Sequence, residues 1–111
     1  MSGAVMHTNV GSLPGTVAAF NDPSFQASAH FEIGGKWSGN DGRIWQFGPA
    51  RGWEAWHVMA GNSMWFGIEH EDGGDPARPL TDAQLTASAQ ILEALSAQKA
   101  AGGSVAGMAV R

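Results

Sequence analysis

The sequence predicts a small α/β domain. Short segments with strand character alternate along the chain with two segments of helical character. The densest apolar run, residues 64–68, lies between turn-forming residues and has the length of a buried strand. Between residues 85 and 95, apolar side chains recur at three- and four-residue spacing, as in a helix that packs one face on a core.

The composition restricts the class of protein. The chain has 111 residues, of which 43% are hydrophobic and 14% charged, and it contains no cysteine. This length suits one domain, so we treat 1–111 as a single unit. Six Lys and Arg residues against ten Asp and Glu residues offer no basic surface to nucleic acid. No apolar run reaches the roughly 18 residues of a membrane span, so neither nucleic acid nor membrane is expected as a partner.

The first half of the chain predicts a strand, a short helix and a hairpin. Residues 4–6 are apolar and lead to His7, so a short first strand is expected to end there. A short helix is predicted over residues 16–20, which contain neither glycine nor proline. Residues 28–33 and 43–47 flank a turn-rich segment and are predicted to form the two strands of a long hairpin.

The second half predicts a loop, a central strand and a long helix. Residues 49–62 show no regular period and are interpreted as a loop crossing one face of the sheet, whereas 64–68 form the central strand. Thr81 and Gln84 have the spacing of a capping box that starts the last helix. The tail, residues 100–111, is expected to be flexible. The apolar stripe of the helix is expected at Leu85, Ser88, Ile91, Leu92 and Leu95.

Histidines are the first candidates for metal ligands, because imidazole is a common zinc donor and the chain has no thiolate. His7 lies at the carboxyl end of the first strand, where open α/β sheets place ligand sites. Its position alone favours a different interpretation, a strand-end histidine that is bonded to backbone. His30 lies inside a predicted strand and is interpreted as a core imidazole with satisfied hydrogen bonds.

The segment Glu69, His70 and Glu71 is the strongest local group of chemically active side chains. Strand alternation places the two carboxylates on one face and the imidazole on the other. Glu69 follows the apolar run, and partial burial would raise its pKa toward the range of a general acid or base; a solvated strand end is the competing interpretation. Glu71, Asp72 and Asp75 lack the spacing of a calcium loop and are interpreted as a solvated cluster.

The predicted loop adds three rings, those of Trp53, Trp56 and His57. Two indoles and an imidazole can form a wall that stacks on sugar or peptide, or a lid over the core. The sequence contains neither a phosphate-binding glycine loop nor a nucleophile elbow, which argues against nucleotide chemistry and serine hydrolysis.

A set of short segments carries a resemblance to a known family. In order, they are His7-Thr8, Ser28-Ala29-His30-Phe31, Asp41-Gly42-Arg43-Ile44-Trp45-Gln46, Ala55-Trp56-His57, Asn62 and Gly67-Ile68-Glu69. Their order and spacing resemble the type 2 N-acetylmuramoyl-L-alanine amidase domain, a family that includes phage endolysins and peptidoglycan recognition proteins. Residues 80–85 match the start of the helix that follows in that family.

The resemblance implies a fold, a reaction and roles for particular residues. The fold is a mixed β-sheet flanked by helices, with a groove that holds zinc and receives the peptide stem of peptidoglycan. The reaction is zinc-assisted hydrolysis, in cell-wall degradation, of the amide between N-acetylmuramic acid and L-alanine. By this resemblance His7 is the first zinc ligand and Glu69 the catalytic acid and base. Trp56 and His57 line the substrate groove.

The chain departs from the family's pattern at the zinc ligands. The family carries a second zinc histidine and a third ligand, Asp or Cys, after the long helix, whereas residues 102–111 contain no His, Asp, Glu or Cys. A hydrolytic zinc normally has three protein ligands. Three interpretations of this departure are open: the chain is the N-terminal two-thirds of a longer enzyme, or the site is rebuilt from His30, His57 or His70, or catalysis is lost. A chain without catalysis would be a module that binds peptidoglycan or muropeptides without cleaving them.

Two further expectations follow from the apparent lack of the family's C-terminal part. The uncovered sheet would expose apolar surface, which a homo-oligomer would cover. The resemblance implies action at the bacterial cell wall. Residues 1–6 lack the positive flank and long apolar run of a secretory signal, so the sequence does not indicate how the chain reaches it.

Overall fold

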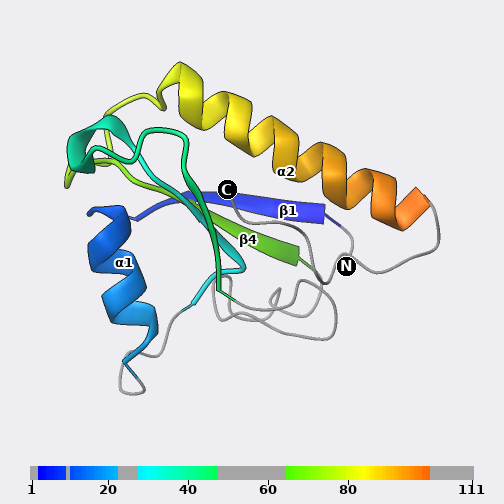
Figure 1. Cartoon of the computed structure of the whole chain (residues 1–111), viewed down its shortest axis with the longest axis horizontal. Coiled ribbons are helices and arrows are strands. Elements are labelled where there is room, and N and C mark those ends of the chain that lie inside the picture. The colour runs from blue at the N-terminus through cyan, green and yellow to red at the C-terminus, as the bar shows by residue number, and fades with distance from the viewer. Residues whose placement is uncertain (1–2, 10, 23–27, 48–64, 101–111) are drawn as a thin grey trace.

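The computed structural model describes residues 3–9, 11–22, 28–47 and 65–100 (Figure 1). The predicted loop over 49–62, with Trp53, Trp56 and His57, lies outside the described residues, as does the tail from residue 101. In chain order the elements are β1 (Gly3–Thr8), α1 (Leu13–Phe20), β2 (Phe31–Ile33), the 3₁₀ helix η1 (Lys36–Ser38), β3 (Ile44–Gln46), β4 (Trp65–His70) and α2 (Asp82–Ala100). This order confirms the predicted α/β class.

The strands form one mixed sheet in the order β1-β4-β2-β3. β4 is parallel to both β1 and β2, while β3 is antiparallel to β2. The mixed sheet confirms the fold that the resemblance implied, and β4 is the predicted central strand. β2 and β3 are the predicted hairpin, although β2 is limited to residues 31–33.

Helix α2 covers one face of the sheet (Figure 1). Its first turn contains the predicted capping box: the Thr81 N–H donates to Gln84 Oε1 at 3.0 Å, and the Gln84 N–H donates to Thr81 Oγ1 at 3.1 Å. Between helix and sheet lies a core of buried side chains, namely Phe31, Ile33, Ile44, Phe66, Ile68, Ala87, Ile91 and Leu95.

The apolar stripe predicted for α2 is right at Ser88, Ile91 and Leu95, which are buried, and wrong at two leucines. Leu85 and Leu92 are 51% and 38% exposed. The difference arises at the preceding turn, where the buried Gln84 points inward. Its Nε2 donates to a backbone carbonyl at 2.8 Å, and this contact rotates the buried face of the helix away from both leucines.

Helix α1 begins earlier than predicted because its N-terminus is capped. The Ser12 side chain accepts a hydrogen bond from the Gly15 N–H at 3.2 Å, and Pro14 occupies the first turn, where its missing N–H costs nothing. Neither α1 nor α2, as far as the structure describes them, is long and apolar enough to cross a membrane.

Adjacent residues of α2 provide a test of the observed helix orientation. Ile91 is 1% exposed, so Ile91→Ala is expected to lower the free energy of unfolding by about 2–5 kcal/mol through lost burial and the cavity it leaves. Leu92→Ala, one residue along at an exposed position, is expected to cost roughly 1 kcal/mol or less. Urea unfolding followed by circular dichroism measures both; equal losses would contradict this orientation.

Candidate active site

A row of polar and aromatic side chains crosses the face of the sheet that α2 does not cover. The strand register pairs His7 of β1 with Glu69 of β4, and Glu69 with Glu32 of β2. Glu32 is paired in turn with Trp45 of β3. Because directly paired residues of neighbouring strands point to the same side, all four side chains share this face. The predicted juxtaposition of His7 and Glu69 on one face is thus present.

Glu69 is half-buried at the centre of this row. Its Oε2 atom is buried and has no hydrogen-bond partner among the described residues. Burial raises the pKa of Glu69 to about 7, and the neighbouring carboxylate of Asp72 adds to the increase. Partial burial therefore acts on this carboxyl as the sequence predicted, and its pKa suits both release and uptake of a proton near neutral pH.

Glu32 is a second buried carboxyl beside Glu69, and sequence reasoning missed it. Asn9 Nδ2 donates to Glu32 Oε1 and also to Thr16 Oγ1, at 2.6 Å for the latter. Glu32 Oε2 is buried and has no hydrogen-bond partner within the described segments. Burial raises the pKa of Glu32 to about 9. Repulsion from three other carboxylates contributes, in the order Glu69, Glu71 and Asp72.

The sequence did carry a signal for Glu32. It lies between two apolar residues, Phe31 and Ile33, and strand alternation places it on the face opposite to theirs. A glutamate in so short an apolar strand is uncommon, since charged side chains are rarely buried without a partner. The pairing of β2 with β4, which no local pattern reveals, is what brings it to Glu69.

The prediction of a solvated acidic cluster is wrong for Glu71, which is fully buried. Its Oε2 accepts hydrogen bonds from the Leu13 N–H at 2.7 Å and from Ser38 Oγ at 2.6 Å, and its Oε1 accepts from the Ser38 N–H at 3.0 Å. These donors compensate the carboxylate for lost water, and the positive end of α1 adds to the effect. Glu71 joins the start of α1 to η1.

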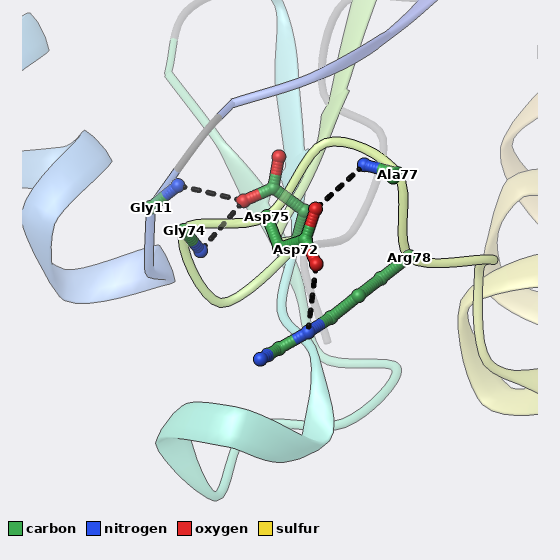
Figure 2. A network of polar contacts seen from close by, with 6 residues as sticks. All are labelled: Gly11, Asp72, Gly74, Asp75, Ala77 and Arg78. Carbon is green, nitrogen blue, oxygen red and sulfur yellow. Dashed lines mark hydrogen bonds and ion pairs between the residues drawn. The ribbon is translucent and has the colours of Figure 1, made fainter.

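Asp72 is also buried, so the prediction is wrong there too, whereas Asp75 is exposed as expected. Figure 2 shows that Asp72 Oδ1 accepts from the Gly11 N–H at 2.9 Å and from the Gly74 N–H at 2.8 Å. Asp75 accepts from the Ala77 N–H at 3.0 Å and forms an ion pair with Arg78 at 3.8 Å. Asp72 therefore joins the turn after β4 to the loop after β1, and Asp75 stabilises the turn itself.

His70 lies on the opposite face of the sheet, against α2. A carbonyl can only accept, so His70 Nδ1 donates to the His7 carbonyl at 2.8 Å, which leaves Nε2 to accept from the Ser88 hydroxyl at 2.6 Å. Burial lowers the pKa of His70, and the hydrogen bond to His7 opposes this decrease. Since both ring nitrogens are occupied, His70 does not serve as a replacement zinc ligand.

His30 is the core imidazole that the sequence predicted, although it precedes β2 instead of lying within it. The side chain is fully buried, and its Nδ1 accepts a hydrogen bond from the Gly67 N–H at 3.0 Å. Its ring packs edge-on against Phe66, with the centroids 5.2 Å apart. This environment also argues against His30 as a replacement ligand.

The described residues do not make up a zinc site by themselves. Within the described ranges, no three His, Asp or Glu side chains come close enough together to hold a metal ion. His57, the remaining histidine considered for a rebuilt site, lies outside them. Among the described histidines, His7 is the one that the strand register pairs with Glu69.

Comparison with known proteins decides the family. Residues 1–105 match the family model described as N-acetylmuramoyl-L-alanine amidase. The chain belongs to this family. It is also 34% identical over 98 residues to N-acetylmuramoyl-L-alanine amidase A of Achromobacter lyticus, an alignment that covers 88% of this chain and 52% of that protein. No solved structure gave a significant match.

Membership of the amidase family confirms the resemblance found in the sequence. The matched range contains the whole described part of the chain, including the strands that carry His7, Glu32 and Glu69. The chain spans about half the length of the Achromobacter amidase.

Glu71 provides a test of the contacts that join the start of α1 to η1. In Glu71→Gln an amide nitrogen replaces one of the two acceptor oxygens and faces buried donors, so the free energy of unfolding is expected to fall by about 1–3 kcal/mol. Glu93→Gln makes the same chemical change at an exposed position of α2 and is expected to cost less than about 0.5 kcal/mol. Urea unfolding of both variants measures the difference, and a Glu71→Gln chain as stable as wild type would contradict the assigned role.

Glu32 provides a test through pH. Its pKa is about 9 in the folded chain against an ordinary value of 4.5, so the folded state retains a proton that the unfolded state releases. Stability from this group is therefore fully present below pH 4.5 and is lost as pH rises toward 9. Glu69 adds a loss of the same sign between pH 4.5 and about 7.

The window between pH 7 and 9 therefore isolates Glu32. Wild-type stability is expected to fall across this window, and Glu32→Gln, which cannot ionise, is expected to remove most of the fall. Urea midpoints measured at closely spaced pH values provide the comparison, with Glu93→Gln as the control that keeps the wild-type slope. An unchanged slope in Glu32→Gln would show that another group titrates.

Proposed function

We propose that the chain is a peptidoglycan hydrolase that cleaves the amide between N-acetylmuramic acid and L-alanine. The observation that carries this proposal is the half-buried Glu69, with a pKa near 7, beside His7 on a sheet face of a chain that belongs to the amidase family. The printed name of the Achromobacter relative supports the same reaction.

In this proposal Glu69 moves the protons of the hydrolysis. As a carboxylate, it accepts a proton from the water that attacks the amide carbonyl carbon. As a carboxylic acid, it then donates that proton to the amide nitrogen, which leaves as the amino group of L-alanine. A pKa close to ambient pH suits a group that must perform both transfers.

We further propose zinc as the cofactor, with His7 as its first ligand. The support is the family resemblance and the position of His7 at the carboxyl end of β1, in register with Glu69. The described residues provide no complete ligand set, so the proposal assigns no other ligand and the metal content must be measured directly. Trp56 and His57 are proposed to line the groove for the peptide stem, and the bacterial cell wall is the proposed place of action.

The test combines metal content with the identity of the product. Purified chain is analysed for bound zinc and then incubated with defined muropeptides, with and without added zinc. Cleavage of the proposed amide releases a peptide with a new L-alanine amino terminus, which mass spectrometry identifies. Glu69→Gln is expected to lower the rate by about 10²–10⁴-fold, because it keeps the shape of the side chain but cannot carry the proton.

Glu93→Gln is the control and is expected to retain wild-type activity, since it lies exposed on α2. Undiminished hydrolysis by Glu69→Gln would contradict the role of Glu69. Binding of muropeptides without release of the new amino terminus, in the presence of zinc, would favour a noncatalytic binding module over a hydrolase.

A further inference from the structure

Glu32 is a buried carboxyl that the proposed reaction does not use. Glu32 and Glu69 are register partners on adjacent parallel strands, and they point to the same face. Neighbouring strands lie about 4.8 Å apart, so two glutamates at paired positions can bring their carboxyl groups together. The partner of Glu32 on its other side is Trp45, whose indole N–H does not bond Glu32 Oε2.

One carboxyl oxygen of Glu32 accepts a hydrogen bond, whereas the other has no partner among the described residues. Asn9 donates to Oε1, and the same amide nitrogen bonds Thr16 on α1, so the loop after β1 and the next helix orient this carboxyl. Oε2 is buried, yet no described residue bonds it. The Oε2 atom of Glu69 is in the same condition. Two unpartnered buried oxygens therefore belong to paired residues.

The two oxygens complement each other if one of them carries a proton. Glu32 is fully buried and Glu69 only half-buried, so burial keeps the proton on Glu32, whose pKa is raised to about 9. The first then has a hydroxyl donor to offer and the second a charged acceptor, a pairing that is stronger than a hydrogen bond between neutral groups. For stability alone, an apolar side chain would serve better than a buried acid with an unused oxygen.

We propose that Glu32 is a positioning residue for Glu69: its Oε2 hydroxyl donates a hydrogen bond, directly or through one water, to the Glu69 carboxylate. Held by Asn9 on one side, Glu32 restricts the rotation of the Glu69 side chain and directs its second oxygen toward the reacting water. This inference rests on the proposed hydrolysis, since Glu69 is positioned for that reaction.

Two substitutions separate positioning from packing. Glu32→Gln keeps an oxygen that accepts from Asn9 and supplies an amide N–H that can replace the hydroxyl donor. Glu32→Leu has a similar volume and no donor. With muropeptide as substrate, Glu32→Leu is expected to lower kcat by about 10–100-fold while KM changes by no more than about twofold. Glu32→Gln is expected to restore most of kcat.

A purely structural role would produce a different pattern, in which any loss of activity follows a loss of folded protein. Glu32→Leu is expected to be at least as stable as wild type, and circular dichroism with urea unfolding checks this. If the Glu32→Leu variant does not fold, Glu32→Met supplies an unbranched side chain without a donor. Glu93→Leu, the matched change at an exposed position, is expected to leave kcat unchanged. Wild-type kcat in folded Glu32→Leu or Glu32→Met would overturn the proposal.

A second measurement does not depend on activity. The ¹³C resonance of the Glu69 carboxyl, assigned by its loss in Glu69→Gln, is recorded at one neutral pH with and without added zinc. It is expected to shift in Glu32→Leu and to return toward the wild-type position in Glu32→Gln. An unchanged resonance in Glu32→Leu would overturn the proposed hydrogen bond. If the resonance shifts in Glu32→Leu and returns in Glu32→Gln, but the wild-type chain hydrolyses no muropeptide, the result would contradict the proposed function and leave the hydrogen bond in place.

Discussion

The register of β4 between β1 and β2 is the constraint on which the rest of the structure depends. Side chains of a strand alternate between faces, so the burial of Phe66 and Ile68 under α2 forces Glu69 onto the other face. A slip of one residue would exchange the two sets and place a carboxylate in the apolar core. The burial of apolar side chains between α2 and the sheet therefore also determines which carboxyl lies beside His7.

The carboxyl ends of the three parallel strands are then held together by the acidic residues that follow β4. Glu71 binds the first residue of α1 and both donors of Ser38, while Asp72 binds Gly11 in the loop after β1. A buried carboxylate is costly without donors, and here the donors come from loops that have no apolar face of their own. These contacts hold the loops after β1, β2 and β4 together beside the candidate site.

Local patterns in the sequence predicted the elements whose causes are local. The capping box at Thr81 and the dense apolar run of β4 depend on neighbouring residues, and both are present in the structure. The buried face of α2 was predicted less well, because the inward turn of Gln84 depends on a carbonyl thirteen residues earlier in the chain. Apolar spacing cannot reveal that a glutamine outcompetes Leu85 for the buried side.

The site was predicted in the same partial way. Glu69 follows an apolar run, and this local context was enough to predict its partial burial. Glu32 and the buried state of Glu71 depend on which strands pair and which loops meet, and neither is encoded within a short window of sequence. The family resemblance supplied roles for His7 and Glu69 but no role for Glu32, which only the sheet register brings to the face that carries Glu69.

The pairing of Glu32 with Glu69 has opposite effects on the stability of the fold and on the proposed proton transfer by Glu69. Below neutral pH both carboxyls are protonated and their burial costs little, but Glu69 can then no longer accept a proton from water. Above pH 9 both are charged and repel each other inside the sheet. Only between the two pKa values does one group hold a proton while the other is free to take one. The fold thus tolerates a costly arrangement that is useful in the pH range where proton transfer by Glu69 is possible.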